Sequence, residues 1–141
     1  MNNELKKIIF ISGAYFIENS YTGKYKLEVD CNELVGKYIF NSTYYNNKIK
    51  WKIKKKHFSE FINKLSELNV FSWKNDYSDS CVCDGGYWSL KFEYLKNEPI
   101  EIKGDNAYPN NFEEFYLILE KYFPIIKMDN KYRWNIQKKY S

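Results

Sequence analysis

Cysteine and histidine are the side chains of this sequence that could form a nucleophilic or metal-binding site. Cys81 and Cys83 are separated by one residue, so both thiols would share a face of an extended strand. Zinc sites favour two or more intervening residues, and the chain adds only Cys31 and His57. A Cys–His nucleophilic pair would need partners that meet in space, which no feature of the sequence indicates. We therefore expect ordinary thiols, a surface histidine before a helix, and no metal, cofactor or catalytic residue.

Two neighbouring motifs form the most distinctive part of the chain: D-G-G-Y-W-S-L, which begins at Asp84, and G-D-N-A-Y-P-N-N-F, which begins at Gly104. In a structural interpretation, the Asp-Gly pair makes a turn, Gly104 allows a sharp exit from a strand, and the proline after Tyr108 keeps that residue extended before a helix. In a functional interpretation, Asp84, Asn106 and Tyr108 present polar groups to a ligand. We expect the structural role and keep these three residues as site candidates.

These motifs resemble those of a family of small uncharacterised bacterial proteins. The shared features are a D-G-x-x-W-x-L strand and a G-x-N-A-Y-P-x-x-F turn into a helix, and the likeness covers residues 84–122. The resemblance implies a bacterial source and supports the fold expected below. It implies no particular activity, cofactor or site.

A basic tract follows the first third of the chain, where Lys48, Lys50, Lys52 and Lys54 alternate with apolar residues. This row could bind a nucleic-acid backbone or an acidic protein. Alternatively, it is the solvated face of a strand whose lysines discourage pairing at the edge of a sheet. The chain has twenty-one lysines and a single arginine, Arg133, which disfavours nucleic acid because lysine lacks the bidentate fork of arginine. The high content of lysine, asparagine and tyrosine, which have AT-rich codons, is typical of a genome with strong AT bias, and we interpret it in that way.

The strands that would position these residues have a period of two or a β-rich composition. They are expected at residues 8–15, 24–30, 35–45, 48–54, 88–94 and 100–103. Residues 35–45 are apolar on both faces, which is typical of a more central strand. Asn46-Asn47 suits a turn into the lysine strand.

Two segments have the period of a helix. The first runs from about residue 57 to 68, with an apolar stripe at Phe58, Phe61, Ile62, Leu65 and Leu68. The second begins near Asn111, whose side chain can cap it, with Glu114 three residues on as in a capping box. The order ββββ-α-ββ-α predicts an α+β fold in which two helices pack on one face of a largely antiparallel sheet of about six strands.

Length and composition fit one domain, residues 1–141, with a basic aromatic tail from about residue 125. Hydrophobic residues make up 44% of the chain, enough for a core without disulfides or metal. The apolar run at 8–17 is too short to span a bilayer, and no small-x-small cleavage site follows it. We read it as a buried strand in a cytoplasmic protein, with an export signal as the alternative.

Three functions stay open at this point. The first is a protein-binding or accessory module, such as an immunity protein that neutralises a toxin. The second is a small-ligand binder or enzyme that uses Asp84, Asn106 and Tyr108. The third is a weak nucleic-acid binder that uses the strand from Lys48 to Lys56. The sequence favours the first, because it contains no catalytic or phosphate-binding motif. It indicates no membrane partner and leaves the oligomeric state open.

Overall fold

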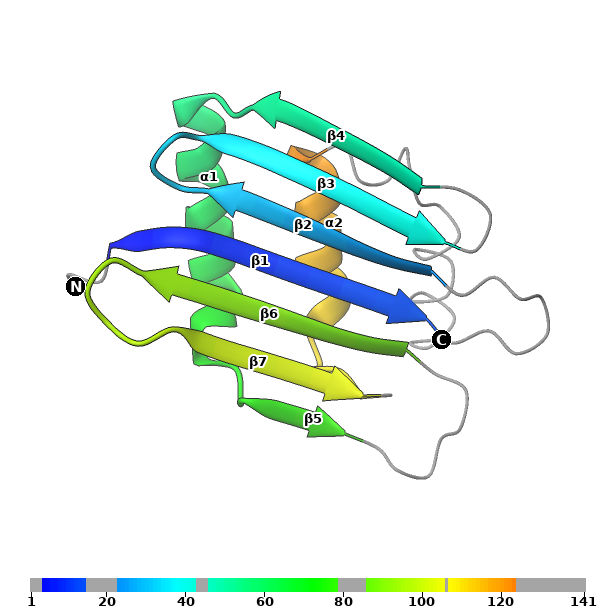
Figure 1. Cartoon of the computed structure of the whole chain (residues 1–141). Coiled ribbons are helices and arrows are strands. Elements are labelled where there is room, and N and C mark those ends of the chain that lie inside the picture. Colours follow the sequence, from blue (N-terminus) through cyan, green and yellow to red (C-terminus); the bar gives the residue numbers. More distant parts are fainter. Residues whose placement is uncertain (1–3, 15–22, 43–45, 79–85, 106, 124–141) are drawn as a thin grey trace.

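A mostly antiparallel β-sheet with two helices on one face forms the framework of the protein (Figure 1). The computed structural model describes residues 4–14, 23–42, 46–78, 86–105 and 107–123. The strands are β1 (Leu5–Ala14), β2 (Gly23–Asp30), β3 (Val35–Ser42), β4 (Asn46–Lys52), β5 (Asp76–Ser78), β6 (Gly86–Tyr94) and β7 (Ile100–Asp105). The helices are α1 (Lys55–Glu67), the 3-10 turn η1 (Val70–Ser72) and α2 (Phe112–Tyr122).

The seven strands lie in the order β4-β3-β2-β1-β6-β7-β5, and only the contact between β5 and β7 is parallel. This confirms the α+β class, the antiparallel character of the sheet and the two helices on one face. Helix α1 follows β4 at one edge, and η1 then leads to β5 at the other edge (Figure 1). The chain thus crosses the sheet once along its covered face.

The number, limits and order of the strands differ from the sequence-based expectations in three details. The sheet has seven strands rather than about six, because β5 was missed; its three residues are too few to show a period. Asn46-Asn47 belongs to β4 instead of a turn. The strand expected to be more central, β3, lies next to the edge, while β1 occupies the middle and bonds to β2 and β6.

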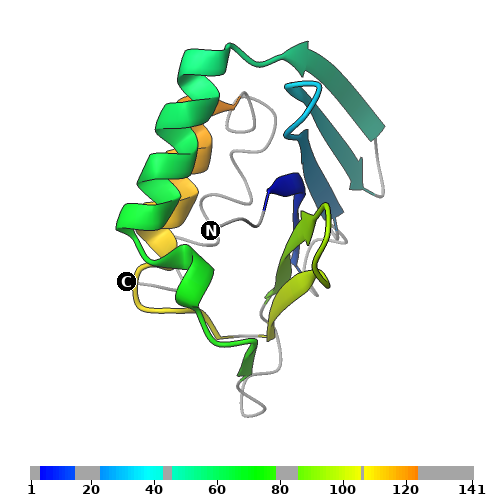
Figure 2. The same ribbon diagram turned by 90° about the vertical axis from the view of Figure 1, so that its left-hand side faces the viewer.

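The core lies between the sheet and the helices, which form two layers in the side view (Figure 2). Alternation along the strands sends every second side chain into it, as expected for a sheet covered on one face. Its most deeply buried large side chains are Phe10, Leu27, Tyr38, Phe61, Leu65, Trp88, Leu90, Phe92, Ile102, Phe112 and Phe115. Helix α1 contributes two of these from the apolar stripe that the sequence predicts, and Phe58, Ile62 and Leu68 pack at the border of the core.

Two glycines on the inner face each lie beneath a tryptophan of the neighbouring strand. Trp88 faces Gly104 across the β6–β7 ladder, and Trp51 faces Gly36 across the β3–β4 ladder. A Cβ atom at either glycine would collide with the facing indole. Gly104 is a regular strand residue with negative φ. The expected role of Gly104 as a sharp exit from the strand is therefore wrong: the close approach of Trp88 explains the glycine.

Neither helix in the described ranges is both long and apolar enough to cross a membrane.

Replacing Gly104 tests this close contact. Gly104→Ala should lower the free energy of unfolding by about 1–3 kcal/mol, because overpacking forces the indole or the backbone to move. In a Trp88→Leu background the same change should cost less, since the colliding ring is absent. Urea denaturation of the four proteins measures both effects. A cost of Gly104→Ala that is equal in the two backgrounds would contradict the packing explanation.

Candidate functional site

Both helices lie on one face of the sheet, so its other face is left uncovered by them (Figure 2). The strand register places charged side chains on this uncovered face in rows that cross the strands. The register places one such row through Lys50, Lys37, Glu28, Ile9, Lys91 and Glu101. We call this surface the outer face. Its cations and carboxylates intermix over β1, β6 and β7, whereas the outward charged residues of β3 and β4 within the described ranges are all lysines.

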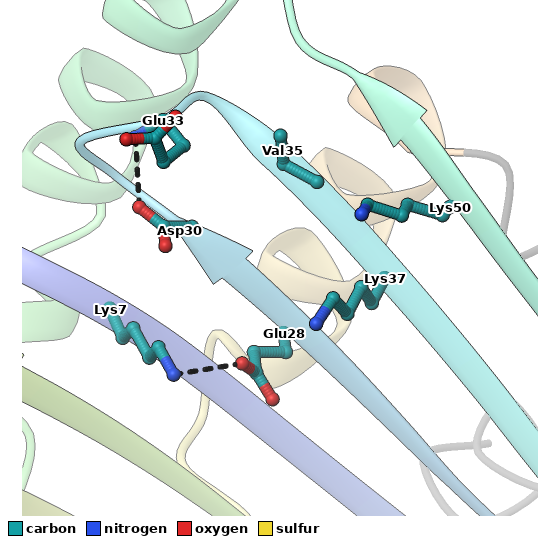
Figure 3. Close-up of a pocket in the computed structure, with 7 residues that line it drawn as sticks. All are labelled: Lys7, Glu28, Asp30, Glu33, Val35, Lys37 and Lys50. Atoms are coloured by element: carbon teal, nitrogen blue, oxygen red, sulfur yellow. Dashed lines mark hydrogen bonds and ion pairs between the residues drawn. The ribbon is translucent and has the colours of Figure 1, made fainter.

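A shallow pocket of about 220 Å³ opens on the outer face beside the β2–β3 turn. Its lining residues are Lys7, Glu28, Asp30, Glu33, Val35, Lys37 and Lys50. Figure 3 shows these side chains on β1, β2, β3, β4 and the β2–β3 turn, with the apolar Val35 at the rim between Glu33 and Lys50. Lysines and carboxylates are equal in number there, so the pocket can accept both signs of charge from a binding partner.

The inner wall of the pocket is held by the ion pair between Lys7 and Glu28. Lys7 Nζ lies 3.1 Å from Glu28 Oε2 (Figure 3). Lys26 Nζ lies 3.5 Å from Glu28 Oε1. The hydrogen bond with Glu28 raises the pKa of Lys7. Partial burial opposes ionisation of Glu28, but its contacts with Lys7 and Lys26 prevail and hold its pKa below the usual value of 4.5. Both groups therefore stay charged at neutral pH.

The upper wall is the β2–β3 turn, which Asp30 stabilises. Its Oδ1 accepts hydrogen bonds from the backbone N–H of Asn32 (3.0 Å) and Glu33 (2.9 Å). The bond from Glu33 is the main reason that the pKa of Asp30 is lowered. Leu34 closes the turn with a φ of 56°, an uncommon conformation for a branched side chain. The turn thus keeps a fixed shape beside the pocket.

Lys37 and Lys50 form the basic side of the pocket. They face each other directly across the β3–β4 ladder, where like charges destabilise a sheet. Among the described residues, neither ammonium group forms an ion pair. Glu28 lies opposite Lys37 on β2, and the charge of Lys37 helps to lower the pKa of Asp30. Because neither ammonium group of the Lys37–Lys50 pair forms an ion pair with a described carboxylate, the pair can still receive an anionic group from another molecule.

The lysine strand predicted from the sequence is β4 together with its continuation into α1. Lys48, Lys50 and Lys52 are exposed on the outer face, and Lys54 is the exposed N-cap residue of α1. Strand β4 also lies at an edge of the sheet, as the edge-protection interpretation requires. Lys37 was missed as a member of this patch. Its position opposite Lys50 depends on the β3–β4 register, which the spacing of lysines along the chain does not reveal.

The second predicted site is described only in part, because Asp84 and Asn106 lie outside the described residues. The Tyr108 ring stacks on Trp88, with centroids 6.2 Å apart, and contacts Phe112 at 4.8 Å. Burial and the charge of Asp105 raise the pKa of Tyr108 to about 12. The nearby Trp88 Nε1–H donates a 2.9 Å hydrogen bond to the carbonyl of Ala107. These contacts give Tyr108 a packing role, and the convergence of all three candidates stays a prediction.

Asn111 has a different role from the helix cap that the sequence suggests. It is the N-cap residue of α2, but its side chain makes no capping hydrogen bond. Instead, Asn111 Oδ1 accepts a bond from Trp73 Nε1 (3.0 Å), and Nδ2 donates to the carbonyl of Leu68 (2.7 Å). One amide thus ties the start of α2 to the end of α1 and to the segment after η1. The capping-box expectation with Glu114 is wrong, because these long-range bonds use both ends of the Asn111 amide.

The nucleophile candidates do not form a reactive pair in the part of the chain that the structure describes. Burial raises the pKa of the Cys31 thiol to about 12, so Cys31 is a thiol at neutral pH. His57 is exposed on α1, where its ring contacts Tyr122 at 6.5 Å. Within the same ranges, no three histidine, cysteine, aspartate or glutamate side chains gather as a metal site. Cys81 and Cys83 lie outside the described residues.

No protein-family model matches this sequence, and comparison with curated proteins finds no match either. The case for function therefore depends on the geometry of the outer face.

The ion pair between Lys7 and Glu28 should couple their effects on stability. In a double-mutant cycle with Lys7→Met and Glu28→Gln, we expect a coupling energy of about 0.2–1 kcal/mol near pH 7. The lowered pKa of Glu28 means that this stability is present above its unfolded-state pKa and is lost as the pH falls through the lower folded-state value. The raised pKa of Lys7 preserves the coupling until the pH exceeds 10.5, its usual value.

Urea denaturation between pH 3 and pH 9 measures this coupling. The more exposed pair of Lys103 and Glu101, separated by 4.0 Å, is the matched control and should show little coupling. Equal coupling in both pairs, or coupling that persists unchanged at pH 3, would contradict this account.

Asn111→Ser distinguishes a cap from the long-range bonds. Serine is as good an N-cap as asparagine, so a capping role predicts almost no loss. Loss of both long-range bonds instead predicts a decrease of about 1–3 kcal/mol in the free energy of unfolding, because Trp73 Nε1 and the Leu68 carbonyl lose their partner. Chemical denaturation gives the answer, with Asn110→Ser as an exposed neighbouring control.

Proposed function

We propose that this chain is a protein-binding module that contacts its partner through the outer face of β2, β3 and β4. The single observation that carries this proposal is the mixed-charge pocket of about 220 Å³ beside Lys37 and Lys50, on the face opposite the helices. Charged groups on such a face contribute little to the stability of the fold. They are therefore available for recognition, where complementary charges steer encounter and reject wrong partners.

The distribution of charge favours a protein partner over nucleic acid. Carboxylates of Glu28, Asp30 and Glu33 line the same pocket as the lysines and would repel phosphate groups. Single-stranded nucleic acids are commonly bound by exposed aromatic rings, which stack on bases. Here Trp51 and Trp88, the tryptophans of the described strands, point away from the outer face and pack in or against the core.

The pocket is also poorly suited to a small-molecule substrate. Ligand sites usually enclose about 300–1,000 Å³ and have mostly apolar walls. This pocket is smaller, and six of its seven lining residues are charged. The thiol of Cys31 and the exposed imidazole of His57 add no activated nucleophile to it. An immunity protein, which neutralises a toxin by binding it, is one form that such a module can take.

Site-specific photo-crosslinking in the source cells tests this proposal. A photoreactive phenylalanine analogue replaces Ile39, which faces Lys26 and Lys48 on the outer face, or Asn63 on the exposed side of α1. We expect a discrete protein adduct from the Ile39 position and none from Asn63. Mass spectrometry identifies the adduct, and nuclease treatment should leave it intact. An adduct only at Asn63, a nuclease-sensitive adduct, or none at either position would contradict the proposal.

A further inference from the structure

The edge of β4 that faces away from β3 pairs with none of the described strands, and we call it the free edge. Its backbone groups are oriented to pair with another strand. Ile53 N–H donates to the Leu34 carbonyl at 2.8 Å, one position beyond the last paired residues of the ladder, Val35 and Lys52. In an antiparallel ladder, bonded and non-bonded residue pairs alternate. Trp51 therefore bonds to β3, while the N–H and C=O groups of Lys50 and Lys52 point away from β3. Among the described strands, β3 is the only neighbour of β4.

Along this edge, charged side chains that point outward alternate with apolar side chains that point inward. Lys50 and Lys52 are exposed on the outer face, whereas Ile49 and Trp51 point inward and are only half-buried. Trp51 contacts Phe123 at 5.8 Å, so its ring lies at the border of the core. A strand added to β4 would lie beside lysines on one face and beside these apolar side chains on the other.

The lysines also select which strand can be added. A basic strand, or β4 of a second copy, would bring lysine close to lysine, and such like-charge pairs are destabilising. Carboxylates beside Lys50 and Lys52 would instead form favourable cross-strand pairs. Lys37, directly behind Lys50, adds to the positive potential and forms no ion pair with a described carboxylate. The lysines therefore disfavour pairing of β4 with a basic strand and favour its pairing with an acidic strand.

We infer that the free edge of β4 binds an extended segment of a partner protein in which acidic and apolar residues alternate. This inference rests on the proposed function and specifies its partner: backbone hydrogen bonds at Lys50 and Lys52 add an eighth strand to the sheet. Acidic side chains of that strand lie on the outer face, and its apolar side chains lie beside Ile49 and Trp51. Strand addition of this kind gives affinity through the backbone and specificity through alternate side chains.

A synthetic peptide provides the test. The probe is a seven-residue peptide of alternating glutamate and valine with glutamate at both ends, and its control has the same residues in two blocks. Fluorescence anisotropy should show binding of the alternating peptide and at least about tenfold weaker binding of the blocked one. Amide hydrogen exchange should show that the alternating peptide protects the N–H groups of Lys50 and Lys52.

Two substitutions separate backbone pairing from charge. Lys50→Gln removes one charge and should weaken peptide binding by about 1.5- to 5-fold. Lys50→Pro also removes the edge N–H without taking a bond from β3, and should weaken binding by at least about tenfold. Circular dichroism checks that both variants fold. If the proline variant does not, protection of Lys50 and Lys52 in the unsubstituted chain still decides the question.

Several outcomes would overturn this inference. Equal binding of both peptides without protection of Lys50 and Lys52 would mean attraction by charge alone. Protection that rises with protein concentration before peptide is added would mean that a second copy pairs with β4. Protection that is present at every concentration would mean that another part of the chain occupies the edge. A partner crosslinked at Ile39 would keep the proposed function intact in each case, so the two failures can be distinguished.

Discussion

The contact between Trp88 and Gly104 is the constraint on which the arrangement of the layers most depends. The indole lies over the glycine of the neighbouring strand and donates its N–H to the Ala107 carbonyl. Its other contacts are rings from separate elements: Tyr77 of β5, Trp73 after η1, Tyr108, and Phe112 of α2. One side chain of β6, next to the central strand, thus contacts the edge strand β5, the segment after β7 and the start of α2. The distinctive D-G-x-x-W and G-x-N-A-Y-P motifs contain most of the residues that this cluster requires.

Because most of the large aromatic rings of this cluster lie on the inner face of the sheet, they are not available for binding on the outer face. The described tryptophans pack in the core or at its border, so none of them lies on the outer face, where the Tyr87 ring packs over Gly13. Its binding capacity depends on charge, on the shape of the β2–β3 turn and on the edge of β4. A mixed-charge surface of this kind suits a protein partner better than a substrate or a nucleic acid. The inward direction of the tryptophans therefore fills the core and also leaves the outer face rich in charged side chains.

The local features of the fold could be predicted from the sequence, whereas the contacts between distant segments could not. Alternation placed the lysines of β4 together on one face of a strand, and a helical period identified the stripe of α1. Strand β5 was missed because it forms only through its neighbour β7. Asn111 has the position of a cap, but its amide bonds residues 38 and 43 positions away. The pocket brings Lys7 beside Glu28 and Lys37 beside Lys50, and both pairs depend on strand order and register.

Lys37 of β3 and Lys50 of β4 place two positive charges opposite each other, which is unfavourable for the sheet. Elsewhere on the outer face, charges of opposite sign lie close together, as in the pairs of Lys7 with Glu28 and Lys91 with Glu93. Lys37 also has Glu28 opposite it on β2, but on the β4 side the register opposes it to a second cation, Lys50. Sequences that fold well tend to satisfy local and global preferences together, and exceptions concentrate at functional sites. A partner that places carboxylates beside these lysines would remove the repulsion, so part of the binding free energy would come from relief of a conflict that the free protein contains.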